Sequence, residues 1–327
     1  MRVRDTHRMA SPITPEKSMV LLDEQMMARA AWYYYFGGQT QQEIAERLGL
    51  TRLRVNKMLA QARAEGHVHI EIRMPLSQCV KLEEELRRRY GLSDVTVVPT
   101  VPDPDALQRM IGEAASAMLG PLLRDGIGIG IGWGGTLSAA VKRLSPRRFP
   151  SSWVVSLMGG LTHGSGANTF EVSTAMARTI GAECYYVAAP IYCPSAENRS
   201  VLLTHYGLAD VMRRAREGDV ALVSAGDLSD RSLLATTHIV GASLPQLRAA
   251  GAVGDLLGTY LDEYGRPVDH PLNQRVIALS LPELKAYPAS ILASGGASKL
   301  AVVRAILNAR YVNRLATDEA VAEALLQ

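Results

Sequence analysis

The sequence predicts an all-α winged helix-turn-helix domain at the N-terminus, followed by a larger α/β domain that contains a doubly wound parallel sheet. Its 327 residues exceed one ordinary domain and suit two. Helical patterns around a glycine turn fill residues 21–75, whereas apolar runs and helix-like stretches alternate through residues 76–327. Residues 1–20 hold two prolines and no periodic pattern, so we expect them to form a leader.

The small domain is expected to contain three helices, over residues 22–36, 40–48 and 51–65. Thr40 and Glu43 form a capping box, in which each side chain can bond the other residue's backbone amide. Gly49 supplies the tight turn before the third helix. Beyond that helix, residues 68–72 alternate between apolar and polar, which predicts the strand, or wing, of a winged helix-turn-helix.

The third helix is expected to bury one face and to leave a polar face for the major groove of DNA. Its apolar residues are Val55, Met58, Leu59 and Ala62. On the polar face, arginine suits guanine, asparagine suits adenine and lysine suits phosphate. We therefore predict double-stranded operator DNA as a partner. The residues assigned to DNA contacts are Thr40, Gln41, Thr51, Arg52, Arg54, Asn56 and Lys57.

Some features of the small domain admit other interpretations. His67 and His69 have a spacing that a metal site could use, but a solvated wing is favoured, so no metal ligand is assigned. The aromatic residues 32–36 could stack on single-stranded nucleic acid, but a core or a subunit interface is favoured. The alternative to DNA binding itself is an ordinary three-helix subdomain with a solvated basic face.

Composition and charge restrict the class of protein. The formal net charge is +3, so binding of nucleic acid must come from a local basic patch. Cys79, Cys184 and Cys193 are too sparse for a disulfide framework and favour a reducing compartment. Residues 1–23 lack the apolar segment of a signal peptide, and no apolar run approaches the length of a membrane span. We therefore expect a cytoplasmic protein without contact to a membrane.

The larger domain is expected to begin with a charged amphipathic helix over residues 76–90 and then to alternate strands and helices. Strands are predicted at residues 95–98, 126–131, 153–157, 184–188, 219–224, 275–278 and 290–293. Helices are predicted at residues 106–123, 137–144, 170–180, 197–205, 244–250, 299–308 and 318–326. Such alternation is typical of a parallel sheet with helices on both faces.

Residues 126–136 give the clearest indication of a binding site, because a buried strand runs into a glycine-dense loop and then a helix. At the carboxyl edge of a parallel sheet, such a loop can turn backbone amides toward an anion. The spacing also fits the dinucleotide fingerprint, but the next strand ends in residues 158–160 without an acid for a ribose. The loop also lacks the lysine of a P-loop. A sugar phosphate is favoured, and no cofactor is predicted.

Other strand ends carry residues that suit a phosphorylated sugar. Residues 294–299 place a glycine pair before a helix and Lys299 one turn inside it, which suits phosphate; a plain turn with a surface lysine is the alternative. Asp255 can accept from sugar hydroxyls, or serve as a structural cap. His163 and Glu197 are weaker candidates. The residues assigned to the effector are Trp133, Gly134, Gly135, Thr136, Gly159, Gly160, Asn168, Asp255, Ser294, Gly295, Gly296 and Lys299.

From about residue 25 to the end, the chain resembles the SorC/DeoR-type family of sugar-binding bacterial repressors. The matching stretches are residues 41–50, 62–66, 130–137, 158–160, 254–255 and 294–299. The resemblance implies a phosphosugar-isomerase-like domain that binds ligand without catalysis, and a homotetramer built as a pair of dimers on operator DNA. It also implies that residues 134–136 and Lys299 hold the effector phosphate, while Asp255 holds sugar hydroxyls. Residues 159–166 look most like the erythritol-operon regulators.

These observations together predict a non-enzymatic transcription regulator, expected to repress a carbohydrate or polyol operon. Effector binding is expected to order residues 133–136 and to change the spacing of the recognition helices. Asp227 disfavours a second phosphate, so a singly phosphorylated or neutral ligand is expected. One alternative is a C-terminal domain that only forms oligomers. The other is a working sugar-phosphate isomerase, whose acid and base would have to come from Glu171, Glu197, Asp255 or His163.

Overall fold

The computed structural model describes residues 15–65, 67–68, 77–161, 168–229 and 232–327. The chain divides into two compact units, Met1–Arg73 and Met74–Gln327, which we call the N-terminal unit and the C-terminal unit. Within the described ranges, no helix combines the length and the apolar character needed to cross a membrane.

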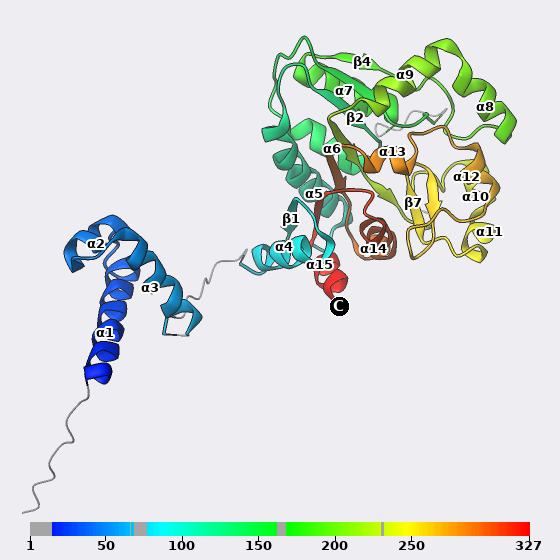
Figure 1. The fold of residues 1–327 in the computed structure, drawn as a ribbon. Coiled ribbons are helices and arrows are strands. Elements are labelled where there is room, and N and C mark those ends of the chain that lie inside the picture. Colours follow the sequence, from blue (N-terminus) through cyan, green and yellow to red (C-terminus); the bar gives the residue numbers. More distant parts are fainter. Residues whose placement is uncertain (1–14, 66, 69–76, 162–167, 230–231) are drawn as a thin grey trace, which may run out of the picture. The chain divides into compact units, whose positions relative to one another are not determined.

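The N-terminal unit contains three helices, α1 (Pro15–Tyr35), α2 (Gln41–Leu48) and α3 (Arg52–Ala64) (Figure 1). The first helix begins before its expected start at Leu22, so that boundary was wrong. Proline is well tolerated in the first turn of a helix, so α1 can begin at Pro15, a residue that had been predicted to lie in a leader. The apolar residues 19–22 also follow one another directly, without the spacing of a helix face.

The predicted capping box at the start of α2 is confirmed. The Thr40 hydroxyl accepts a hydrogen bond from the Glu43 amide at 3.3 Å, and the Glu43 carboxylate accepts one from the Thr40 amide at 2.8 Å. Gly49 then adopts a left-handed backbone with φ of 65°, which ends α2 and turns the chain into α3. The three helices bury a common apolar core. Apart from His67 and Val68, the expected wing lies outside the described residues.

The C-terminal unit is built on a seven-stranded sheet in which neighbouring strands pair in parallel. Its strands are β1 (Asp94–Val98), β2 (Gly128–Ile131), β3 (Trp153–Ser156), β4 (Glu183–Tyr185), β5 (Val220–Val223), β9 (Ala289–Ala293) and β10 (Arg314–Asp318). Their order across the sheet is β1-β10-β9-β5-β2-β3-β4. The chain winds from β2 outward to β4 in one direction, and from β5 outward to β10 in the other. The sheet is therefore doubly wound, as predicted.

Helices cover both faces of this sheet (Figure 1). One face packs against α5 (Pro104–Leu119), α6 (Gly135–Arg143) and α7 (Thr169–Ile180). The other packs against α4 (Ser77–Tyr90), α14 (Leu300–Ala309) and α15 (Glu319–Leu326). A small antiparallel sheet follows β5 and comprises β6 (Ala225–Gly226), β7 (Gly254–Leu256) and β8 (Thr259–Leu261). Shorter elements are η1 (Gly120–Leu122), α8 (Ala196–Thr204), α10 (His238–Gly241), α11 (Leu244–Ala249), α13 (Leu281–Lys285) and η2 (Ala297–Lys299).

Part of this architecture differs from the prediction. The strand expected at residues 275–278 is absent from the described fold: α12 (Pro271–Arg275) ends there, and Val276 and Ala278 form only isolated bridges. The strands β6, β7, β8 and β10 were not predicted, because they are short or carry polar residues at their ends and so give no continuous apolar run. Helix α9 (Tyr206–Arg216) was also missed, although its buried residues Leu208, Met212 and Ala215 have helical spacing.

Helices α5 and α6 approach each other closely at Gly112. A Cβ atom at this position would lie 2.7 Å from the Thr136 carbonyl oxygen and 2.7 Å from the Ala139 Cβ. Side chains cannot occupy such distances, so the packing requires glycine at this point. The contact positions the first turn of α6 against α5.

We expect Gly112→Ala to destabilise the protein. Overpacking costs about 1 to 3 kcal/mol, which exceeds the gain of about 1 kcal/mol from the higher helix propensity of alanine. Gly120→Ala is the matched control, because Gly120 is helical with φ of −48°, and a Cβ atom added there would meet no other atom within 4 Å. Urea unfolding should show a lower midpoint for Gly112→Ala alone; equal midpoints for the two variants would contradict the close approach.

Candidate functional site

A cavity of about 830 Å³ lies where the carboxyl ends of several parallel strands meet. Residues that follow β1, β2, β5, β9 and β10 line it. Strands β2 and β5 are neighbours at the point where the winding of the sheet reverses. Because open α/β sheets bind ligands in the crevice at such a point, this cavity is the candidate ligand site.

The glycine loop between β2 and α6 borders the cavity. Gly134 has φ of 116°, in the left-handed region that side chains rarely adopt. The next residues begin α6, and the amides of a first helical turn have no partner within the helix. The Gln108 side chain from α5 covers Gly135, because a Cβ at Gly135 would lie 2.3 Å from its amide oxygen. The loop thus offers backbone donors and the positive end of a helix dipole to an anion.

Lys299 at the end of η2 lines the same cavity, together with Asp227 and Asp255. Burial lowers the pKa of Lys299, while the charges of the two aspartates counteract this effect. Among the described residues, no hydrogen-bond or ion-pair partner engages its ammonium group. Its three N–H donors are therefore available to a ligand.

Asp255 presents a partly unpaired carboxyl group to the cavity. Its Oδ2 accepts a hydrogen bond from the Gly258 amide at 2.9 Å, and its Oδ1 lies against the backbone of Gly226. Burial raises the pKa of Asp255 to about 6; the charge of Asp227 acts in the same direction, whereas the Gly258 amide and Lys299 oppose it. A buried carboxyl with a free oxygen can accept a hydrogen bond from a ligand hydroxyl.

Asp227, by contrast, is fully hydrogen-bonded within the protein. Its Oδ1 accepts from the amide and the hydroxyl of Ser229, at 3.0 and 2.5 Å, and its Oδ2 accepts from the Ser298 hydroxyl at 2.5 Å. Burial by itself would raise the pKa of Asp227, but these hydrogen bonds and the charge of Lys299 outweigh burial and lower the pKa. Asp227 therefore keeps a negative charge at the edge of the cavity.

Asp318 joins three segments at the edge of the cavity. Its Oδ1 accepts from the Gly296 amide at 2.7 Å, and its Oδ2 accepts from the Thr100 hydroxyl at 2.9 Å. A Cβ at Gly295 would lie 2.3 Å from the same Oδ1, so the loop can approach only because that residue is glycine. Asp318 thereby fixes the loop before Lys299 relative to the end of β1.

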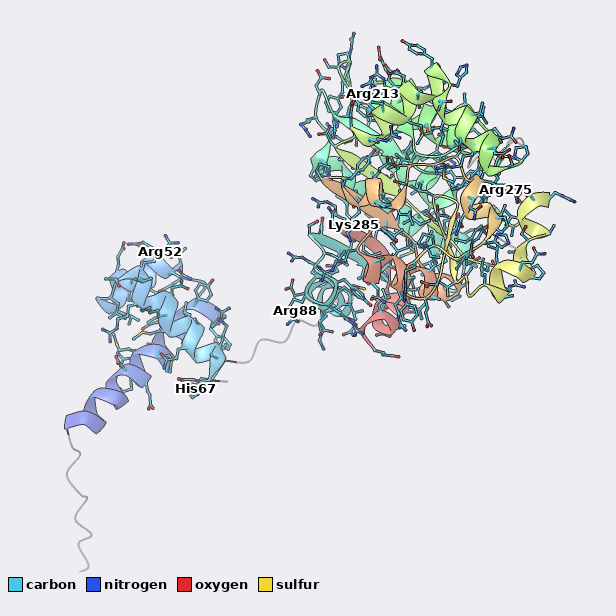
Figure 2. The ribbon with its side chains drawn as sticks, turned by 45° about the vertical axis from the view of Figure 1, so that its right-hand side comes forward. Arg52, His67, Arg88, Arg213, Arg275 and Lys285 are labelled. Carbon is cyan, nitrogen blue, oxygen red and sulfur yellow. The ribbon has the colours of Figure 1, made fainter. Side chains whose placement is uncertain are left out.

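A second candidate site is the outward face of α3 in the N-terminal unit. Thr51, Arg52, Arg54, Asn56 and Lys57 are all exposed, and Arg52 extends outward from the start of the helix (Figure 2). The Thr51 hydroxyl caps α3 by accepting from the Arg54 amide at 3.3 Å. These residues form a continuous polar surface that carries positive charge.

Contacts with α1 and α2 orient two residues of this face. The Gln41 side-chain amide at the start of α2 donates to the Asn56 side-chain oxygen at 3.4 Å. Thr40 belongs to the capping box, so its side chain is already hydrogen-bonded within the helix. Arg54 forms an ion pair with Asp23 of α1, at 2.8 Å between Nη2 and Oδ1, and both side chains are exposed. Arg54 is thus less free than Arg52 to meet an external anion.

Comparison with known proteins assigns the chain to a family. A family model described as "Putative sugar-binding domain" matches residues 74–327. The erythritol catabolism regulatory protein EryD of Brucella abortus is 31% identical, over 93% of this chain and 97% of its own length. Transcriptional regulator LsrR of Klebsiella pneumoniae is 30% identical, over 94% of each chain. This chain belongs to the SorC-type family of sugar-binding transcriptional regulators.

A solved structure supports the fold of this regulator. The full-length sorbitol operon regulator SorC from Klebsiella pneumoniae matches it with a TM-score of 0.72, over 93% of this chain and 99% of that chain, at 24% identity. The two relatives EryD and LsrR have nearly equal identity to the regulator, at 31% and 30%. The predicted placement among erythritol-operon regulators therefore stays a prediction.

Most of the effector residues assigned from the sequence of the regulator line the cavity. They are Trp133, Gly134, Gly135, Thr136, Asp255, Gly295, Gly296 and Lys299. They converge because each follows the carboxyl end of a strand, or lies in the small sheet beside β5. They meet beside the reversal of strand winding between β2 and β5, where a doubly wound sheet is expected to bind its ligand.

Four assigned residues do not line the cavity. A Cβ at Gly159 would lie 2.6 Å from a backbone oxygen, and one at Gly160 would lie 2.4 Å from a phenylalanine ring, so both glycines permit close packing. Asn168 begins α7 as part of a capping box. Ser294 is fully buried at the end of β9. In the described structure these residues support the fold around the cavity.

The weaker candidates do not add to either site. Glu197 is exposed in the first turn of α8 and does not line the cavity, and His163 lies outside the described residues. His67 lies 3.3 Å from the Glu65 carboxylate, whereas His69 is also outside the described residues. Nothing brings these groups together in the part of the chain that the structure describes.

Some cavity residues were not predicted; they belong to α5, to β10 and to the segment that follows β1. Gln108, Thr100 and Asp318 line the cavity but lie far in sequence from the glycine loops. Asp318 was placed at the start of the last helix, and it does cap that helix. Its position beside the cavity depends on β10, whose mixed polar and apolar sequence gave no strand signal.

The ion pair between Asp23 and Arg54 predicts how a charge change would alter DNA binding. Asp23→Asn frees Arg54 and removes a negative charge from the same face. We expect tighter binding to a 20-base-pair duplex. The logarithm of the binding constant should also fall more steeply with the logarithm of the salt concentration, by the amount that about one additional phosphate contact gives. Fluorescence anisotropy across a salt series measures both. Glu323→Gln makes the same change of charge on α15 and should have no effect; equal behaviour of the two variants would contradict the prediction.

The raised pKa of Asp255 predicts a pH dependence of stability. Because the folded-state pKa of about 6 exceeds the ordinary value of 3.8, the folded state holds a proton that the unfolded state releases. The wild type should therefore lose stability as pH rises from about 4 to about 6, by about 2 to 3 kcal/mol. Asp255→Asn cannot ionise and should lack this loss. Urea unfolding of both proteins at pH 4 and pH 7 tests this, and parallel pH profiles would refute it.

Proposed function

We propose that the regulator represses genes for the catabolism of a small sugar or polyol, and that the polyol or its monophosphate binds in the cavity as the effector. The position of Lys299 carries this proposal. Lys299 lines the same cavity as the first turn of α6 and has free donors, while Asp255 offers a free acceptor. A phosphate would bind the lysine and the helix terminus, and hydroxyls would bind the carboxyl group.

The charge of the cavity supports an effector with at most one phosphate. Lys299 is the cationic side chain among the described residues that line it. The acidic side chains lining it are Asp105, Asp227, Asp255 and Asp318. Since Asp227 stays ionised, a second phosphate would face uncompensated negative charge. A monophosphate or a neutral polyol fits this balance better than a bisphosphate.

A chain of contacts leads from the cavity to the helix that follows the N-terminal unit in sequence. Gly296 bonds Asp318, Asp318 bonds Thr100, and Thr100 follows β1. The Glu83 carboxylate of α4 in turn accepts from the Val97 amide of β1 at 2.9 Å. We propose that effector binding acts on α4 through this chain. A coupling of about 1 to 3 kcal/mol would change operator affinity about 5- to 150-fold.

The name of one relative supports a polyol as the effector. EryD is called an erythritol catabolism regulatory protein, and it is 31% identical over nearly the whole chain.

The proposal also includes operator DNA bound through α3, and a homotetramer as the functional assembly. Because no described hydrogen bond pairs an acid with a base in the cavity lining, we propose a sensor rather than an isomerase.

Ligand-induced stabilisation tests the role of Lys299. We expect a higher unfolding midpoint with erythritol, erythritol phosphate, a pentitol or a pentitol phosphate, since a ligand at 100 times its Kd adds about 2.7 kcal/mol. Lys299→Ala should abolish the shift caused by a phosphorylated ligand. Lys285→Ala is the control, because Lys285 is exposed and outside the cavity lining.

Each outcome of this experiment is informative. A shift with a neutral polyol that survives Lys299→Ala would keep the sensor and refute the phosphate contact. A shift with a sugar bisphosphate alone would contradict the charge argument. The absence of a shift with every compound in the panel would refute the proposed effector class.

A further inference from the structure

Leu53 is the exposed apolar residue at the start of α3. Its side chain is 67% exposed, although both sequence neighbours, Arg52 and Arg54, are charged and exposed. A single exposed leucine is ordinary on a protein surface. The basis for assigning Leu53 a function is its position on α3, and not its exposure alone.

Leu53 lies on the side of α3 that faces away from the N-terminal unit. The buried residues of the helix are Val55, Met58, Leu59 and Ala62. With 3.6 residues per turn, Leu53, Lys57 and Ala60 fall on the opposite side, and all three are exposed. Leu53 is also in the first turn of α3. When a helix-turn-helix docks on DNA, the N-terminal residues of its second helix reach the base edges.

The chemistry of leucine restricts what it can contact there. Its side chain has no donor or acceptor, so it cannot bond a phosphate or a polar base edge. The 5-methyl group of thymine is the apolar group that base pairs present in the major groove. The cations Arg52 and Lys57 beside Leu53 suit the phosphates that border the groove. They disfavour a two-fold contact with a second copy of α3, which would bring like charges together.

We propose that Leu53 contacts the methyl group of a thymine, and thereby makes the regulator select an A·T pair at that position of its operator. This inference rests on DNA binding through α3 and adds one specificity-determining residue to it. Arg52, Asn56 and Lys57 supply polar contacts, whereas Leu53 supplies discrimination by shape and apolar burial.

Deoxyuridine substitution in the operator tests the contact directly, because it removes only the thymine methyl group. The full-length protein first selects its operator from a random 30-base-pair library. Each thymine of the selected duplex is then replaced singly by deoxyuridine, and affinity is measured by fluorescence anisotropy. We expect the wild type to bind about 3- to 5-fold more weakly when one particular thymine of a half-site is replaced, as burial of one methyl group requires.

Protein variants identify the residue that reads the methyl group. Leu53→Ala should weaken binding to the natural operator by at least the same factor and be insensitive to deoxyuridine at that position. Leu53→Met keeps an apolar side chain and should retain the sensitivity. Val80→Ala is the matched control, because Val80 is 60% exposed on α4 of the C-terminal unit and should leave binding unchanged.

Several results would overturn the proposal. Equal sensitivity of the wild type and Leu53→Ala at every thymine would show that another residue reads the methyl group, or that none does. A changed oligomeric state of Leu53→Ala in light scattering would assign the side chain to a contact between copies. If the wild type selects no sequence at all, DNA binding itself fails, and the proposal fails with it.

Discussion

The reversal of winding between β2 and β5 is the constraint on which the C-terminal unit depends. Adjacent strands whose crossovers leave in opposite directions cannot both have their carboxyl ends covered by helices, so a crevice opens between them. The glycine loop, the loop before Lys299 and the small sheet that carries Asp255 all border this crevice. Each comes from a different crossover, and only the topology brings them together.

Charge balance is the second determinant of the site. Asp227 is stabilised as an anion by hydroxyls and an amide, whereas Asp255 lies close to the border between its charged and neutral forms. Lys299 lies near both and has no fixed partner among the described groups. The two aspartates already balance part of the positive charge of Lys299. A ligand therefore need not supply all of the compensating negative charge. The site thus suits a ligand that brings hydroxyls to the carboxyl groups as well as an anion to the lysine.

The parts of the site that the sequence predicted are local ones. The capping box at Thr40, the turn at Gly49 and the loop at Gly134 each depend on residues a few positions apart, and the structure contains all three features. The glycines at 159 and 160 were assigned to the effector because glycine-rich strand ends often bind ligands. Here they allow neighbouring segments to pack, and a sequence cannot distinguish these two uses of glycine.

The residues that were missed depend on contacts across the fold. Gln108 reaches the glycine loop only because Gly112 lets α5 and α6 approach. Asp318 reaches the loop before Lys299 only through the pairing of β10 with β9. Leu53 was overlooked for another reason. Only polar residues of the third helix were assigned to DNA, although the major groove also presents an apolar group, the thymine methyl.

The pairing of β1 with β10 has a consequence for synthesis of the protein. The hydrogen bond between Thr100 and Asp318 spans 218 residues, so the first strand of the sheet stays unpaired until the last strand has been made. The N-terminal unit depends on no such distant contact among its helices, and a domain of this kind can fold while the ribosome is still at work. A nascent chain would thus carry a folded helix-turn-helix before it has a completed sensor, and control by the effector can begin only after β10 has been made.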